Sequence, residues 1–93
     1  MVEIYDAFIL AKQAIRVTKG TIEFYGFTLL KFLKWLEDSG TANPNELHER
    51  HVRQFLSFLT SEGKSDRNTH SNARDIKTFV RFLNNGGYID REI

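Results

Sequence analysis

The side chains best suited to chemistry in this sequence are basic ones near its C-terminal end. When residues 66–84 are placed on a helix at about 100° per residue, their basic side chains form one continuous stripe beside the apolar face. The stripe consists of Arg67, His70, Arg74, Lys77 and Arg81. Residues 64–81 hold five Lys or Arg and two Asp, a local charge of +3, so the total of +1 leaves −2 for the rest of the chain. Such a stripe can bind nucleic-acid phosphates through counterion release, and Asn68, His70 and Asn72 could reach base edges or the backbone. A solvated helix face would carry the same charges, so both interpretations remain open from charge alone.

The other residues that could do chemistry form no recognisable catalytic or metal site. His48 and His51 lie three positions apart near an expected helix start, but no convincing third ligand accompanies them. We interpret both as surface residues beside a helix cap. The absence of Cys excludes a disulfide, a Cys-based zinc site and a thiol nucleophile. Asn85-Gly86-Gly87 is typical of a helix end rather than of a phosphate-binding loop. We therefore expect no catalytic residue, no metal and no cofactor.

Helices must position these side chains, because apolar residues recur at threes and fours along nearly the whole chain. Polar and Gly-containing breaks predict four helices, at about residues 2–15, 20–39, 48–61 and 66–84. Thr18 or Thr21 should cap the second helix and Ser65 or Asp66 the fourth. The short loops predict that successive helices pack as neighbours. The expected fold class is all-α, a compact four-helix orthogonal bundle.

The apolar stripes predict which face of each helix turns inward. The first helix offers Ile4, Phe8, Ala11 and Ile15. The fourth offers Thr69, Ala73, Ile76, Phe79, Val80 and Leu83. Asp75 lies on the flank opposite the basic stripe. Tyr88 and Ile89 are expected to fold back on the last turn of the fourth helix.

The second helix is apolar nearly all round. Phe24, Phe27, Leu30 and Trp35 lie off its inward stripe. The simpler interpretation, which we favour, is a central helix whose extra face is covered by the first helix. The alternative is an exposed aromatic patch that binds a partner protein or domain.

Length and composition indicate one ordinary domain. The chain has 93 residues, of which 41% are hydrophobic and 27% charged, as in globular rather than disordered chains. Glu3, Asp6 and Lys12 interrupt the apolar residues near the N-terminus, so no targeting segment is predicted. No window is apolar enough to span a membrane. We expect a cytoplasmic protein with no membrane partner.

The order of these residues resembles a known family. The second segment reads Thr21-Ile22-x-x-Tyr25-x-x-x-Leu29-x-x-Phe32-Leu33-x-Trp35-Leu36-x-x-x-Gly40. The third reads His51-Val52-Arg53-Gln54-Phe55-Leu56-Ser57-Phe58-Leu59, followed by Gly63-Lys64-Ser65. The last runs from Thr69 through Ala73, Arg74, Ile76, Lys77, Phe79, Phe82 and Leu83 to Gly87-Tyr88-Ile89. Over about residues 7–89 this pattern resembles the N-terminal core-binding domain of tyrosine recombinases, the group that includes phage integrases and Xer-type enzymes.

The resemblance implies a SAM-like bundle that forms half of a C-shaped clamp around DNA. In that family the second and fourth helices lie against the major groove of the recombination core site. The first helix often contacts a neighbouring protomer. Carried over residue by residue, the implied DNA-binding residues are Thr18, Lys19, Thr21, Arg67, Asn68, Thr69, His70, Arg74 and Lys77. The implied partners are double-stranded DNA, the catalytic domain of the same chain and other recombinase protomers.

The family's catalytic residues lie in a separate C-terminal domain, and nothing in this sequence matches them. We therefore expect no enzymatic activity from this chain alone. The favoured interpretation is the first domain of a longer recombinase, with residues 90–93 beginning the interdomain linker. A stand-alone homologue of that domain is the alternative. Two other functions stay open: a helical SAM-like protein-protein interaction module, and a small helix-turn-helix regulator built on the Gly63-Lys64-Ser65 turn.

Overall fold

The chain folds into helices joined by short loops. The computed structural model describes residues 2–41 and 43–89, apart from the side chain of Val2. The elements in chain order are α1 (Val2–Ala14), α2 (Lys19–Asp38), a short 3-10 helix η1 (Pro44–Glu46), α3 (Glu49–Ser61) and α4 (Asp66–Asn85). No strand occurs among these residues. The all-α prediction is confirmed, and each predicted helix boundary lies within one residue of the observed one.

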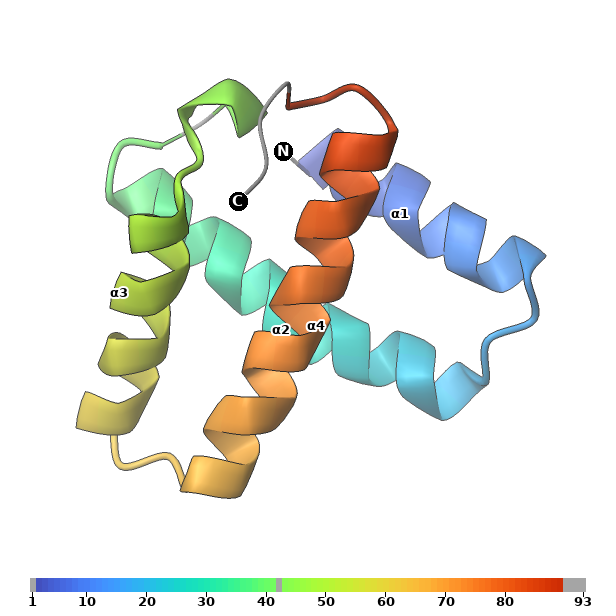
Figure 1. Cartoon of the computed structure of the whole chain (residues 1–93). Helices are drawn as coiled ribbons and strands as arrows, with labels where there is room; N and C mark the ends of the chain where they lie inside the picture. The colour runs from blue at the N-terminus through green and yellow to red at the C-terminus, as the bar shows by residue number, and fades with distance from the viewer. Residues whose placement is uncertain (1, 42, 90–93) are drawn as a thin grey trace.

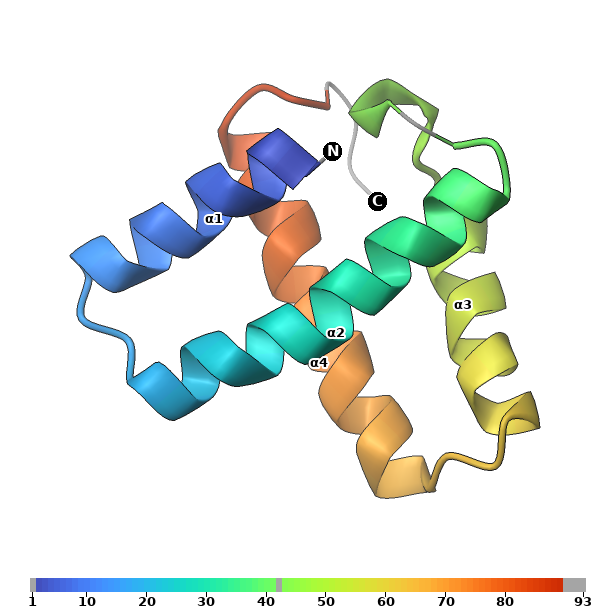
Figure 2. The same ribbon diagram turned by 180° about the vertical axis from the view of Figure 1, so that it is seen from behind.

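The two longest helices cross near their middles and form the centre of the domain. Figure 1 shows α4 in front of α2, with α3 beside α4 on one side and α1 along α2 on the other. Figure 2, seen from behind, shows the same crossing with α2 in front. The two helices cross steeply, so their N-terminal halves diverge from the crossing (Figures 1 and 2). This is the orthogonal bundle that the sequence predicts. We refer to these N-terminal halves of α2 and α4 as the two arms.

Local side chains explain where α2 and α4 begin. The Thr18 hydroxyl accepts the Thr21 backbone N–H at 3.3 Å, and the Ser65 hydroxyl accepts the Asn68 N–H at 3.1 Å. Each bond satisfies one amide that the first helical turn leaves unpaired. The caps are therefore Thr18 and Ser65, rather than Thr21 and Asp66.

The start of α3 uses a different cap, which corrects the prediction that His51 is a surface residue. The His48 backbone N–H donates to Nδ1 of His51 at 2.9 Å, and the His51 side chain is buried. Burial, together with the charges of Arg50 and His48, lowers the pKa of His51. A neutral ring keeps Nδ1 available as an acceptor. His51 is thus an internal cap residue.

One core joins all four helices. Its fully enclosed side chains are Phe8, Leu29, Phe32, Leu36, Leu47, Phe55, Leu59, Ile76, Phe79, Leu83 and Ile89. Phe8 attaches α1 to this core: its ring meets those of Tyr25, Phe79 and Phe82 edge-on, with centroids 5.2, 5.3 and 5.4 Å apart. Such edge-to-face pairs add to the stabilisation that burial provides.

The chain folds back after α4, as predicted. Gly87 has φ of +77°, and the Tyr88 backbone N–H donates to the Leu83 carbonyl at 2.9 Å. This reversal places Ile89 in the core with 2% of its surface exposed. The linker predicted at residues 90–93 lies outside the described residues.

The packing of α1 differs from the prediction in two respects. Ala11 is exposed, and Ile15 follows the end of α1 and is 67% exposed, so neither belongs to the inward stripe. Phe24, Phe27 and Leu30 are 62%, 77% and 46% exposed, so α1 does not cover them, although Trp35 packs against the core. The reason is that α1 approaches α2 on another side, where a Cβ at Gly26 would lie 3.2 Å from the Tyr5 hydroxyl.

Phe8→Ala should therefore destabilise the whole domain. We expect a loss of about 3–5 kcal/mol in the free energy of unfolding, because the substitution empties a fully buried aromatic site. Urea denaturation followed by circular dichroism measures this loss. Ile15→Ala, at an exposed position, is the matched control and should change stability by less than about 0.5 kcal/mol. Equal effects of the two substitutions would contradict the packing of α1.

Candidate nucleic-acid interface

The basic stripe of α4 is exposed along its length. Arg67, His70, Arg74, Lys77 and Arg81 all have exposed side chains. At about 1.5 Å per residue, the stripe extends roughly 21 Å from Arg67 to Arg81. Among the described residues, the two ion pairs are Lys31–Glu62 and Arg53–Glu49, so no member of the stripe pairs with a described carboxylate. These charges are therefore available to an anionic ligand.

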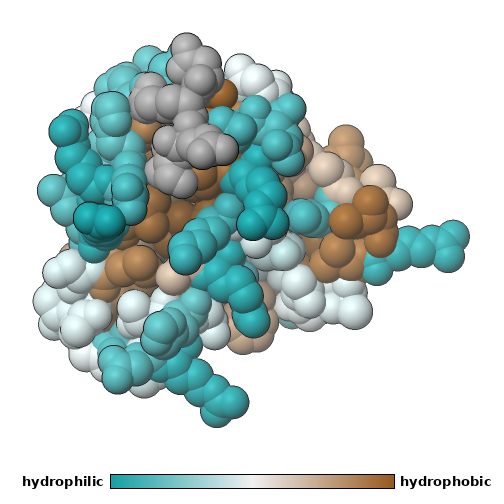
Figure 3. All heavy atoms as spheres, viewed as in Figure 1, coloured by the Kyte–Doolittle hydropathy of each residue, from teal (hydrophilic) through white to brown (hydrophobic). Residues whose placement is uncertain are grey.

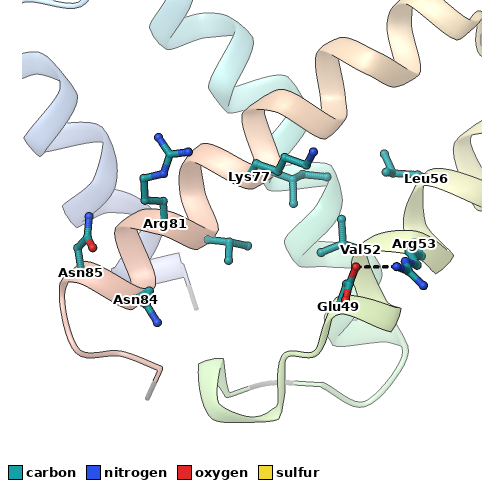
Figure 4. A pocket seen from close by; sticks show the side chains of 10 residues that line it. Glu49, Val52, Arg53, Leu56, Lys77, Arg81, Asn84 and Asn85 are labelled. Carbon is teal, nitrogen blue, oxygen red and sulfur yellow. Dashed lines mark hydrogen bonds and ion pairs between the residues drawn. The ribbon is translucent and has the colours of Figure 1, made fainter. Parts of the chain in front are cut away.

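Beside the C-terminal half of the stripe, α3 and α4 enclose a hollow of about 560 Å³. Its apolar lining is Val52, Leu56, Ile76 and Val80. Figure 4 shows Lys77 and Arg81 on the α4 side, and on the α3 side Glu49 joined to Arg53, whose Nη2 lies 2.7 Å from Glu49 Oε1. Figure 3 shows hydrophilic surface over both helices with hydrophobic surface between them. Arg53 thus adds a cation to this region, although its own carboxylate partner offsets it.

The second group of predicted residues lies at the start of α2. Thr18, Lys19 and Thr21 are exposed, and the Thr18 hydroxyl donates to the Thr21 hydroxyl at 2.9 Å. Because α2 and α4 diverge from their crossing, this group does not join the stripe in one cluster (Figure 1). A ligand that touches both groups must be long enough to reach both arms.

A second hollow, of about 270 Å³, lies between the two arms. Its lining combines one aromatic ring with hydroxyls, amides and a guanidinium: Phe24, Thr28, Ser65, Arg67, Asn68, Ser71 and Asn72. The Asn72 side-chain nitrogen donates to the backbone carbonyl and to Oδ1 of Asn68, at 2.8 and 2.9 Å. The two amides are therefore held in one arrangement on the α4 side of the hollow.

A buried polar pair joins α2 to α4. The Thr28 hydroxyl donates to Asp75 Oδ2 at 3.1 Å, and both side chains are buried. Burial raises the pKa of Asp75, whereas the bond from Thr28 and the charge of Arg74 act in the opposite direction. Asp75 is therefore an acid held inside the fold next to a basic surface.

The sequence falls within a known protein family. A family model described as phage integrase, N-terminal SAM-like domain, matches residues 4–86, a span that reaches from the first turn of α1 to the end of α4. The chain belongs to this family. No curated protein and no solved structure gives a significant match. The integrase family confirms the resemblance and the SAM-like fold, and the matched part is the small N-terminal domain rather than the catalytic domain.

The structure places all but one of the nine predicted integrase DNA-binding residues on the surface. The exception is Thr69, which is half-buried. Its hydroxyl oxygen is enclosed and has no hydrogen-bond partner among the described residues. Thr69 lies only about 20° from the centre of the apolar stripe at 100° per residue, so its side chain turns toward the interior. Its predicted contact with DNA is therefore not supported by its position.

The sequence did not predict several features of this region. Asp75 lies on the predicted flank of α4, but neither its burial nor its bond to Thr28 was predicted. The only available signal was its position 100° from Ile76, toward a neighbouring helix. The hollow beside Phe24 was not predicted either, because its two walls come from helices that are distant in the sequence.

Metal binding and membrane insertion are two further possibilities for the described part of the chain. It holds no group of three or more His, Cys, Asp or Glu side chains that could bind a metal ion. None of its helices has the length and hydrophobicity required to cross a membrane.

The buried acid predicts a specific dependence of stability on pH. Because the folded-state pKa of Asp75 is raised, the fold favours the protonated form, so the ionised form costs stability at neutral pH. Asp75→Asn should therefore be more stable than the wild type at pH 7. This advantage should shrink as the pH falls through the raised pKa toward the ordinary range of Asp. Chemical denaturation at several pH values between 7 and 4 measures the difference.

Thr28→Val, on the other side of the same hydrogen bond, should lower the stability of the fold. It removes the donor to a buried acceptor and should cost about 1–3 kcal/mol at pH 7. If Asp75→Asn were less stable than the wild type by the same amount at every pH, the assignment of a raised pKa would be wrong.

Proposed function

We propose that this chain is the DNA-binding core-binding domain of a site-specific tyrosine recombinase or integrase, and that it forms half of a clamp around double-stranded DNA. The main support is the exposed stripe on α4, whose five basic side chains lack a carboxylate partner among the described residues. Membership of the integrase SAM-like family supports the same function. In this proposal the domain positions DNA for integration or recombination and performs no chemistry itself.

The two arms have different roles in the proposed complex. Arg67, His70, Arg74 and Lys77 of α4 contact phosphates, and the release of counterions provides affinity. Thr18, Lys19 and Thr21 contact the DNA from the start of α2. Since the whole chain has a net charge of only +1, we expect weak binding by the isolated domain with a marked dependence on salt.

The proposal includes further partners. A catalytic domain of the same chain completes the clamp, and other recombinase protomers assemble on the same DNA. The domain then acts as one part of a longer cytoplasmic recombinase. Its own contribution is to bind and orient the DNA.

A second candidate function rests on a different observation. Phe24, Phe27 and Leu30 leave a large part of α2 apolar and exposed. Exposed apolar patches often mark protein-binding surfaces, so a SAM-like protein-protein interaction module is the alternative. Concentration-dependent self-association that DNA does not affect would favour it.

The double variant Arg74→Ala/Lys77→Ala tests the proposed function. It should weaken binding to a fluorescent 20-base-pair duplex by about tenfold at low salt. It should also reduce the slope of log affinity against log salt by about two, one for each lost phosphate contact. Fluorescence anisotropy over a series of salt concentrations measures both quantities.

Lys34→Ala/Arg50→Ala is the matched control, because it removes two exposed positive charges that line neither hollow. It should have a much smaller effect on affinity. Equal losses for the two double variants would overturn the proposed interface. NMR shifts on DNA addition that avoid residues 18–25 and 64–81 would do the same.

A further inference from the structure

The hollow between α2 and α4 has a feature that phosphate binding does not use. Phe24 lines it with 62% of its surface exposed. A phosphate offers nothing to an aromatic ring, and water around the ring is unfavourable. In the major groove of DNA, the apolar group that a side chain can contact is the C5 methyl of thymine.

The opposite wall of the hollow presents an ordered pair of amides. The Asn72 side-chain nitrogen donates to both the Asn68 carbonyl and Asn68 Oδ1. These bonds fix the orientation of both amides. They leave the Asn72 oxygen as an acceptor and the Asn68 nitrogen as a donor, neither with a described partner. The pair therefore presents one donor beside one acceptor.

This combination matches one kind of base pair. Adenine shows an acceptor, N7, beside a donor, the N6 amine, and its partner thymine adds the methyl group. Guanine instead shows two adjacent acceptors, N7 and O6. One of them would face the Asn72 oxygen, which is also an acceptor, so no hydrogen bond could form there. We propose that the hollow between α2 and α4 recognises an A·T base pair in the major groove, with Asn68 and Asn72 on adenine and Phe24 on the thymine methyl.

This inference rests on the proposed DNA-binding function and adds a sequence preference to it. Arg67 lines the same hollow and belongs to the basic stripe. It therefore connects the phosphate contacts to the base contacts. Phe24 and the two amides would act as specificity-determining residues, whereas Arg74 and Lys77 lie outside this hollow and contribute affinity without sequence preference.

Removing the thymine methyl tests the role of Phe24. The probes are a 20-base-pair alternating A·T duplex and the same duplex with deoxyuridine in place of thymidine. For the wild-type chain we expect affinity to fall about threefold on the change to uracil, as suits the loss of one apolar methyl contact. Phe24→Ala should bind the two probes equally. Phe27→Ala, an exposed phenylalanine on the same helix that does not line the hollow, should keep the wild-type difference.

A second comparison tests the amides. Asn72→Ala removes the acceptor and the bonds that orient Asn68, so it should reduce the preference for the A·T duplex over an alternating G·C duplex of the same length. It should leave the salt dependence of binding unchanged, because no phosphate contact is lost.

The outcomes separate this inference from the proposed function. No binding to any duplex at low salt would overturn both. Binding with equal affinity for the A·T and G·C duplexes would overturn the A·T preference and leave the proposed function standing. Equal affinity for the thymine and uracil probes would overturn the contact between Phe24 and the thymine methyl. If Phe24→Ala and Phe27→Ala then also had equal effects, a protein partner for the exposed aromatic residues of α2 would be favoured instead.

Discussion

The crossing of α2 and α4 determines which side chains of this domain can meet a ligand. Leu29 and Phe32 of α2 and Ile76 and Phe79 of α4 are fully enclosed in the shared core. Burying these faces rotates α4 so that its basic stripe must point outward, and it turns Thr28 toward Asp75. The steep angle leaves the first halves of both helices apart (Figures 1 and 2). The hollow beside Phe24 lies between residues of these two halves. Both proposed modes of DNA contact therefore depend on the packing of this one pair of helices.

The features that could be predicted from the sequence belong to single helices. The stripe from Arg67 to Arg81 follows from helical spacing alone, because every member lies on one helix. Local residue types also narrow each cap to two candidates, of which the structure selects Thr18 and Ser65. The hollow beside Phe24 could not be predicted in this way, since it depends on the angle between two helices. For the same reason the prediction that α1 covers the extra apolar face of α2 was wrong. Periodicity identifies an apolar face, but it does not say which neighbour covers that face.

The distribution of charge is more informative than its total. A net charge of +1 would by itself argue against a nucleic-acid partner. Yet the exposed residues of the stripe from Arg67 to Arg81 are all basic, and Asp75, which lies between Arg74 and Lys77 in the sequence, is withdrawn into the fold and bonded to Thr28. The other acid of α4, Asp66, is exposed at the first position of the helix, before the stripe begins. A carboxylate at the surface would repel phosphates, whereas a buried and hydrogen-bonded one is distant from the ligand. Burial of Asp75 thus leaves only positive charges along the stripe itself.

The reversal after α4 has a mechanical consequence. Ile89 lies in the core five residues after Asn84, held there by the turn at Gly87 and by the ring of Tyr88 stacked on Phe82, with centroids 6.0 Å apart. Tension applied to the chain beyond Ile89 would first have to extract this side chain before it could unwind α4. The buried Ile89 side chain therefore protects the C-terminal end of α4, the helix that carries the basic stripe, from unwinding under a pulling force. A domain tethered at that end would then move as a rigid unit, and rotation of the tether would be transmitted to α4 and to any DNA held against it.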